Sequence, residues 1–229
     1  MIFVELAKRG RKFALRKIEG VAAIQEGVGR AIEMGRPVHW TEGHPMASKL
    51  FDARGPYLVA GLAILSYMAG LCARMKARLI VSVGHPELYP LTTEIVKTVY
   101  LAEGASDRYV ESDIQLMPEQ SYSIVAAGRL EREKPGCHAS TGYFFYQDSM
   151  LIPEVAQGLG SYNIAAGQVS TIPFFIITCS SVLIADEFFA AAAGITNHPM
   201  DVGGMVGGEM GKLAAMILIV VGAILVTLG

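Results

Sequence analysis

The sequence predicts an α/β fold with a mostly parallel sheet, helices on both of its faces, and one transmembrane helix after it. Two observations predict this class. Short apolar runs alternate with helical segments of about 10–20 residues, which is the pattern of βαβ units. Residues 213–229 are then apolar without a single charge. At 1.5 Å per residue they cover about 25 Å, close to the roughly 30 Å hydrocarbon core of a bilayer.

Helix signals recur through the part of the chain that precedes this span. Apolar residues spaced three or four apart, glycine after a last turn and proline in a first turn mark the expected helices. Pro153 should kink or break the helix that contains it. The expected helices are 21–34, 55–76, 91–101, 119–133, 146–158 and 186–193.

The strands expected between these helices carry few charges, as in a parallel sheet that is covered on both faces. The uncharged run 57–73 is long enough to resemble a span, but a basic segment and a strand follow it, so we interpret it as a core helix. Residues 172–185 are interpreted as one or two buried strands. The other expected strands are 37–40, 78–83, 113–117, 136–141 and 163–166.

Charge is distributed unevenly along the chain. Residues 1–17 carry six basic groups and one acidic group, whereas the whole chain has a net charge of −2. Such a start suits anionic lipid headgroups, although a merely solvated basic segment is the alternative. Nucleic acid is disfavoured because no aromatic interleaving follows. The expected organisation is a basic membrane-proximal arm at 1–19, an α/β domain at 20–202, a Gly-rich hinge at 203–212 and the anchor at 213–229.

The anchor also predicts a location. Lys212 can extend its charge to the headgroups, and Leu213, Gly222 and Leu228 are expected within the membrane. Because Lys212 and the arm both precede the span, the positive-inside rule places the domain in the cytoplasm and the anchor in the inner, cytoplasmic membrane. Widely spaced cysteines at 72, 137 and 179 agree with buried thiols in a reducing compartment.

Ordered sequence blocks run through nearly the whole chain from about Lys17. They are Glu26–Val38, Gly61–Tyr67, Pro86–Pro90, Tyr100–Gly104, Arg132–Pro135, Gly142–Phe145, Ile172–Phe175 and Asp186–Ala191. Together they resemble a prokaryotic family of membrane-anchored α/β proteins that is defined only as a domain of unknown function. The resemblance implies no established activity or catalytic residues. Members of that family often carry transmembrane sequence ahead of the basic arm.

Motifs for cofactor or metal chemistry are missing from the sequence. The five histidines form no HxH, HxxxH or HExxH pattern, so neither a metal nor a cofactor is expected. The run Gly27–Ile32 lacks the third glycine of a dinucleotide fingerprint, and Gly207–Lys212 lacks the hydroxyl residue of a P-loop. Cys137 and His138 would point to opposite faces of a strand and cannot act as a pair.

Polar residues follow several strands and form the candidate ligand site. Glu42 and His44 follow one strand, and Glu87 lies in the loop after the next; they would converge if the two strands are neighbours. Solvated loop residues are the alternative, and helix capping is the alternative for the acidic pair that follows the last strand. The candidate ligand-binding residues are His44, His85, Tyr89, Asp186 and Glu187.

Four consecutive aromatic residues suggest an interface. Tyr143, Phe144, Phe145 and Tyr146 cannot all point inward from one strand or helix, so we expect an exposed patch and a homo-oligomer. The alternative is that the run lies beneath a loop. The first functional hypothesis is a scaffold or assembly protein that contacts the bilayer, itself and other membrane proteins. The second is a membrane-tethered enzyme or small-molecule sensor that uses the strand-end crevice.

Overall fold

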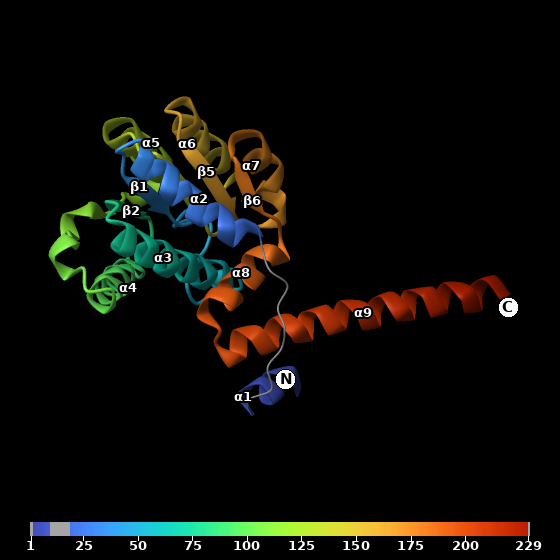
Figure 1. Ribbon diagram of the computed structural model, residues 1–229. Helices are drawn as coiled ribbons and strands as arrows, with labels where there is room; N and C mark the ends of the chain where they lie inside the picture. The colour runs from blue at the N-terminus through green and yellow to red at the C-terminus, as the bar shows by residue number, and fades with distance from the viewer. Residues whose placement is uncertain (1, 10–18, 229) are drawn as a thin grey trace. The chain divides into compact units, whose positions relative to one another are not determined.

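The computed structural model describes residues 2–9 and 19–228 (Figure 1). The chain forms two compact units. Residues 18–192 make up the larger unit, the α/β domain, and residues 1–17 with 193–229 make up the smaller one.

A six-stranded parallel sheet lies at the centre of the α/β domain. Its strand order is β3-β2-β1-β4-β5-β6, which is the order of doubly wound dinucleotide-binding folds, with the switch point between β1 and β4. The predicted parallel sheet is therefore confirmed. The strands are β1 Val38–Thr41, β2 Leu79–Val83, β3 Ile114–Leu116, β4 Cys137–Thr141, β5 Tyr162–Ala166 and β6 Ser181–Leu183.

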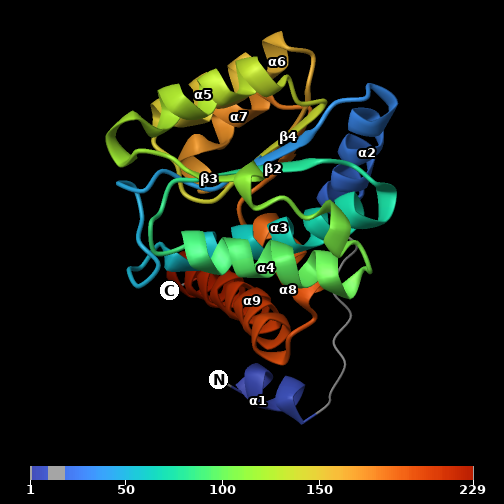
Figure 2. The same cartoon turned by 90° about the vertical axis from the view of Figure 1, so that its left-hand side faces the viewer.

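Helices cover both faces of this sheet (Figure 2). One face is covered by α2 Glu19–Glu33, α3 Gly55–Met75 and α4 Tyr89–Ala102. The other is covered by α5 Tyr122–Glu133, α6 Tyr146–Gly158 and α7 Ile172–Thr178. After β6 the chain continues into α8, Asp186–Thr196, and short 3₁₀ turns lie at Ser106–Arg108, Glu111–Asp113, Glu119–Ser121 and Val169–Thr171.

Buried apolar residues fill the spaces between the sheet and its helices. Trp40 at the centre of β1 is fully buried, and its indole N–H donates to Thr141 Oγ1 at 2.9 Å. The apolar helix α3 is 67% buried over its most apolar window, so it is a core helix, as the sequence predicts. Pro153 lies inside α6, and the helix continues on both sides of it without a break.

One expectation about the sheet is wrong. Residues 172–185, which we interpreted as strand, fold as α7 followed by the short strand β6. Proline in the first turn favours a helix start because its missing N–H would have no partner there in any case. The buried residues Ile172, Phe175 and Thr178 recur every three positions, but Ile176 and Ile177 on the outer side are apolar too. Apolar residues on both sides of a short helix imitate a buried strand.

The smaller unit contains α1, Ile2–Lys8, packed against the long helix α9, Pro199–Leu228. Residues 203–212, expected as a hinge, are helical throughout and form part of α9. Each helical glycine there costs about 1 kcal/mol relative to alanine, so this segment depends on packing for its stability. Residues 10–18 of the expected basic arm lie outside the described residues.

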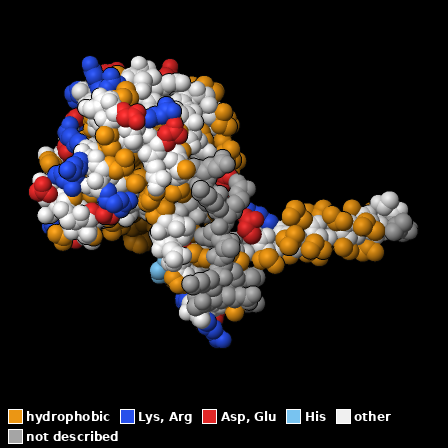
Figure 3. Space-filling view, in the orientation of Figure 1, with side chains coloured by type: hydrophobic (Ala, Val, Ile, Leu, Met, Phe, Trp, Pro, Cys, Tyr) orange, Lys and Arg blue, Asp and Glu red, His pale blue; other side chains and the backbone are white. Residues whose placement is uncertain are grey.

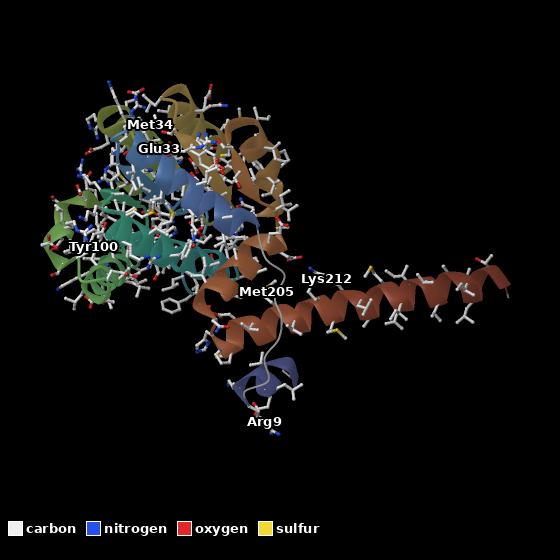
Figure 4. The ribbon with its side chains drawn as sticks, in the orientation of Figure 1. Arg9, Glu33, Met34, Tyr100, Met205 and Lys212 are labelled. Carbon is white, nitrogen blue, oxygen red and sulfur yellow. The ribbon has the colours of Figure 1, made fainter. Side chains whose placement is uncertain are left out.

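The remainder of α9 has the composition of a membrane-spanning helix. The charged residues of α9, Asp201, Glu209 and Lys212, all precede Leu213, and Lys212, labelled in Figure 4, marks the last of them. Lys212 pairs with Glu209 at 3.1 Å. The helix has a mean hydropathy of 2.3 over its most apolar window, none of which is buried. Hydrophobic side chains follow its last part in the space-filling view (Figure 3). Leu213 and Gly222 lie in this part; the side chain of Leu228 is outside the described residues.

Candidate functional site

The carboxyl ends of β1 and β2 bring two of the predicted polar residues together. β1 and β2 are parallel neighbours, so the residues that follow them share one edge of the sheet. Glu42 Oε1 accepts hydrogen bonds from the backbone N–H groups of Gly84 at 2.9 Å and His85 at 2.8 Å. The same oxygen lies 2.9 Å from His85 Nδ1. Both residues are 1% exposed, so this is a buried ion pair.

The partners of His85 determine its protonation. Its Nε2 lies 3.0 Å from the carbonyl oxygen of Ser48, which can only accept, and its Nδ1 faces a carboxylate oxygen that already accepts two N–H groups. Donation from both ring nitrogens, to the carboxylate and to this carbonyl, requires an imidazolium, whereas Nε2 of a neutral ring would instead accept from Ser48 Oγ at 3.4 Å. Burial lowers the pKa of His85, but the hydrogen bond and charge of Glu42 outweigh it and the net shift is upward.

Glu42 has one further property. Its second carboxylate oxygen, Oε2, is buried and has no hydrogen-bond partner among the residues that the structure describes. A buried carboxylate oxygen without a partner carries a desolvation cost of about 1–3 kcal/mol or more. This oxygen can therefore accept a hydrogen bond that none of the described residues donates.

His44 lies on the same edge. Its Nδ1 accepts the backbone N–H of Met46 at 3.1 Å, so the neutral ring carries its proton on Nε2. The ring packs against Tyr122 and Phe145, with ring centroids 5.1 and 4.9 Å apart. Burial lowers the pKa of His44, and the charge of Asp148 opposes that shift.

Asp148 is the fourth polar group of this edge. It is fully buried, it accepts the backbone N–H of Phe145 at 3.2 Å, and Ser123 donates to its other oxygen. Burial raises the pKa of Asp148, although both hydrogen bonds and His44 oppose the shift. The sequence carries no signal that marks Asp148 as a site residue, because it lies inside the first turn of a predicted helix.

The other three predicted ligand residues lie at helix starts. Tyr89 begins α4 one turn after His85, and its backbone N–H donates to the carbonyl oxygen of His85 at 3.2 Å; its phenol joins burial and Glu111 in raising the pKa of Tyr109. Asp186 and Glu187 begin α8 after β6, the edge strand on the opposite side of the sheet from β2. The carboxylate of Glu187 accepts the backbone N–H of Ile184 at 3.3 Å, which is the helix-start role that was the alternative for this pair.

A second polar cluster, which the sequence analysis missed, crosses the middle of the sheet. His39 and His138 are register partners on β1 and β4, and their Nδ1 atoms lie 2.8 Å apart. His39 Nε2 lies 2.8 Å from Ser82 Oγ, and His138 Nε2 lies 2.9 Å from Ser140 Oγ. Arg129 of α5 is 2% exposed and donates to Ser82 Oγ at 3.2 Å. All five side chains form one connected hydrogen-bonded chain.

Arg129 fixes one donor in this chain. A guanidinium can only donate, so Ser82 Oγ accepts from Arg129. Between two neutral imidazoles 2.8 Å apart, one Nδ1 donates and the other accepts, and each Nε2 then pairs with the serine hydroxyl beside it. Burial is the main cause that lowers the pKa of His39, and it lowers the pKa of His138 to about 3. Both imidazoles are therefore neutral.

The switch-point crevice, where this fold class binds dinucleotides, is filled by the chain itself. The backbone N–H of His44 donates to the carbonyl oxygen of Tyr143 at 2.8 Å. Gly43 packs so closely there that a Cβ atom would lie 2.0 Å from the same oxygen. Because the loops after β1 and β4 pack directly on each other, the residues here do not fit a dinucleotide.

A family model for a domain of unknown function, DUF6754, matches residues 1–229. The chain belongs to this family. No curated protein and no solved structure matches it. The resemblance drawn from the sequence blocks is confirmed to the extent of a shared domain of unknown function.

In this DUF6754 chain the aromatic run divides between core and surface, which corrects one expectation. Phe144 is 2% exposed and packs against Phe175, so it is not available to a partner. Tyr143 packs edge-on against Tyr57. Phe145 is 36% exposed beside His44, and Tyr146 is 58% exposed.

The exposed end of that run adjoins a surface without charge. Residues 155–185 contain no Asp, Glu, Lys, Arg or His. Within them Val169, Ile176 and Ile177 are 66%, 58% and 74% exposed, and Phe174 of α7 contacts Tyr146 with ring centroids 5.5 Å apart. Hydrophobic side chains gather along this side of the domain (Figure 3). We name these five residues, Tyr146, Val169, Phe174, Ile176 and Ile177, the uncharged face.

Proposed function

We propose that this protein is a membrane-anchored scaffold or assembly protein that acts as a homo-oligomer. Its α/β domain lies in the cytoplasm, α9 spans the inner membrane of a prokaryotic cell, and the basic arm contacts anionic headgroups. The observation that carries the proposal is the uncharged face, because soluble domains rarely gather large exposed apolar side chains unless a partner covers them.

A second copy of the chain is the partner that this face suits best. In a two-fold contact each surface meets its own copy, so a charge of either sign would approach its equivalent and repel it. The uncharged face avoids that repulsion because no charged residue occurs in positions 155–185. Anchoring in one membrane also confines the copies and raises their effective concentration. The face would form the apolar centre of an interface of about 1,600 Å² in total.

Charge also supports the proposed topology. The acidic and basic groups of α9 all lie before Leu213, so the span itself carries no charged side chain through residue 228. The six basic groups of residues 1–17 lie on the same side of the span. The positive-inside rule then favours a cytoplasmic domain.

A ligand sensor or enzyme remains the second candidate, and one observation favours it. At the strand-end edge, Glu42 Oε2 has no hydrogen-bond partner among the described residues, and the other oxygen of this carboxylate lies 2.9 Å from the ring of His85. Polar groups gathered at strand carboxyl ends are where α/β folds place their sites. A small molecule that copurifies with the detergent-solubilised protein and is lost from a Glu42→Gln variant would support this candidate.

Replacing Ile177 with lysine is expected to dissociate the oligomer. An ammonium group placed in an apolar contact costs at least about 2 kcal/mol, or a factor of about 30 in the dissociation constant. Ile124 of α5 provides a matched control because it is 71% exposed, against 74% for Ile177, and lies outside the uncharged face. The measurement is the protein mass of the detergent-solubilised particle by light scattering. We expect Ile177→Lys to lower the mass and Ile124→Lys to leave it unchanged.

A monomeric wild-type particle would contradict the proposed homo-oligomer. An oligomer that persists in Ile177→Lys would show that a different surface holds the copies together. Both substitutions are at exposed positions, so circular dichroism of each variant should match the wild type.

A further inference from the structure

The connection between β1 and α3 folds back over the strand ends. Residues 44–54, which we name the cap loop, follow Glu42 and Gly43 directly. On the inner side Ala47 is fully buried, Ser48 is 2% exposed, and Pro45 packs over Gly84. On the outer side Phe51 is 95% exposed. The cap loop therefore covers the carboxylate of Glu42 without burying its own largest apolar side chain.

Most hydrogen bonds of the cap loop are internal. The backbone N–H groups of Lys49 and Arg54 donate to the carboxylate of Asp52, and Arg54 also donates to the carbonyl oxygen of Ala47. The first residue of the loop, His44, is held by the carbonyl oxygen of Tyr143, and the guanidinium of Arg54 at its other end lies over the Tyr143 ring, 5.0 Å from the centroid. Between these ends, among the described residues, only His85 joins the loop to a distant part of the chain by hydrogen bonds, through Nε2 to the carbonyl oxygen and Oγ of Ser48. A loop that holds its own shape and is attached at one point between its two ends can move as a unit when that point is released.

We infer that the cap loop is a lid over the strand-end site and that His85 is its latch. The latch works because β2 fixes His85 and Glu42 fixes its ring. Nδ1–H donates to Glu42 Oε1 at 2.9 Å while Nε2–H holds Ser48 at 3.0 Å. Opening uncovers Glu42 Oε2, the buried atom without a hydrogen-bond partner among the described residues. This inference is independent of the proposed oligomer.

The latch depends on the charge of His85. A neutral imidazole has one N–H and cannot donate to both Glu42 and the carbonyl oxygen of Ser48, so loss of the proton removes the 3.0 Å bond to that carbonyl and leaves only the longer 3.4 Å contact with Ser48 Oγ. The groups that face this imidazole are Glu42 after β1 and Glu87 ahead of α4, both favouring its proton, and His44 of the cap loop, whose own pKa is lowered by burial and by the charge of His85. His44 of the cap loop has Asp148 and Glu119 as its own acidic neighbours. The lid is therefore closed at low pH and loosens as the pH rises through the raised pKa of His85.

Hydrogen exchange of the full chain in detergent tests the latch. The variant His85→Asn places an amide N–H near the position of Nδ1, which preserves the bond to Glu42, but it has no atom that reaches Ser48. We expect the protected amides of residues 46–54 to exchange at least about tenfold faster, because a hydrogen bond from a charged donor is lost. The amides of α5 report global unfolding and should not change. His198→Asn, an exposed histidine outside the α/β domain, is the matched control.

The pH dependence of the wild type gives a second measurement that needs no variant. After correction for intrinsic exchange, opening of residues 46–54 should increase between pH 6 and 9 in the wild type and stay flat in His85→Asn. Equal exchange of these residues in the wild type and His85→Asn would overturn the latch. A parallel increase in α5 would also overturn it, because His85 would then support the whole domain rather than the cap loop.

Discussion

Acidification from pH 7 to pH 5 is expected to lower the unfolding free energy of the α/β domain by about 2 kcal/mol through His138, with a further loss through His39. In the unfolded chain each imidazole binds a proton near pH 6.5. In the folded chain burial keeps the pKa of both far lower, to about 3 for His138. Below pH 6.5 the unfolded state binds more protons than the folded state. The free energy of unfolding therefore decreases as the pH is lowered, by up to about 1.4 kcal/mol per pH unit for each histidine.

Urea denaturation followed by the fluorescence of Trp40 measures this effect, because Trp40 is the single tryptophan and adjoins His39 in β1. The quantity to compare is the difference in unfolding free energy between pH 7 and pH 5, which separates titration from any loss of packing. His138→Asn should reduce that difference by about 2 kcal/mol. His198→Asn, an exposed histidine, should leave it unchanged. An undiminished difference in His138→Asn would show that other groups cause the acid sensitivity.

The histidine pair illustrates what a single sequence does not contain. His39 and His138 each lie inside a short apolar strand, where one histidine gives no signal of a partner. Their contact depends on β4 lying beside β1, a pairing of strands that are not consecutive in the sequence. The available signal was a histidine at the second position of both strands. That signal becomes useful only once the switch point between β1 and β4 is known.

The proximity of Glu42 and His85 could be predicted from the sequence, because the strands that they follow are consecutive. β1 and β2 are consecutive, and consecutive strands of βαβ units are usually neighbours, so their carboxyl ends converge. Asp186 and Glu187 follow β6 at the far edge, and their distance from β2 depends on the complete strand order. Local chemistry thus predicted the polar residues, while sheet topology decided which of them meet.

Apolar composition predicted two of the helices correctly and gave a wrong prediction for a third. It identified α3 and α9 as long apolar helices, yet only packing separates them: the first lies between sheet and helices, and the apolar window of the second is exposed. It failed for α7, whose outer side chains Ile176 and Ile177 are as apolar as its buried ones. Ile176 and Ile177, which misled the secondary-structure prediction, belong to the uncharged face.

Deleting residues 212–229 is expected to move the protein from the membrane pellet to the soluble fraction. From Leu213 to Leu228 the helix α9 carries no charge and is about 25 Å long. Insertion of such a helix into the hydrocarbon core of a bilayer is effectively irreversible. The basic groups of residues 1–17 would still attract anionic headgroups, at about 1 kcal/mol each. That attraction is screened by salt, so release of the truncated protein should be completed by a high-salt wash.

The full chain should resist both high salt and carbonate, whereas the truncated chain should resist neither. A chain in which residues 213–229 are replaced by a leucine and alanine segment of equal length is the matched control, and it should return to the pellet. If the truncated protein stays in the pellet after both washes, a different segment crosses the membrane. Among the described helices α3 is the other one that is long and apolar enough, and 67% of its most apolar window is buried in the α/β domain. Its insertion would require unfolding that core, so we expect α9 alone to account for retention in the membrane.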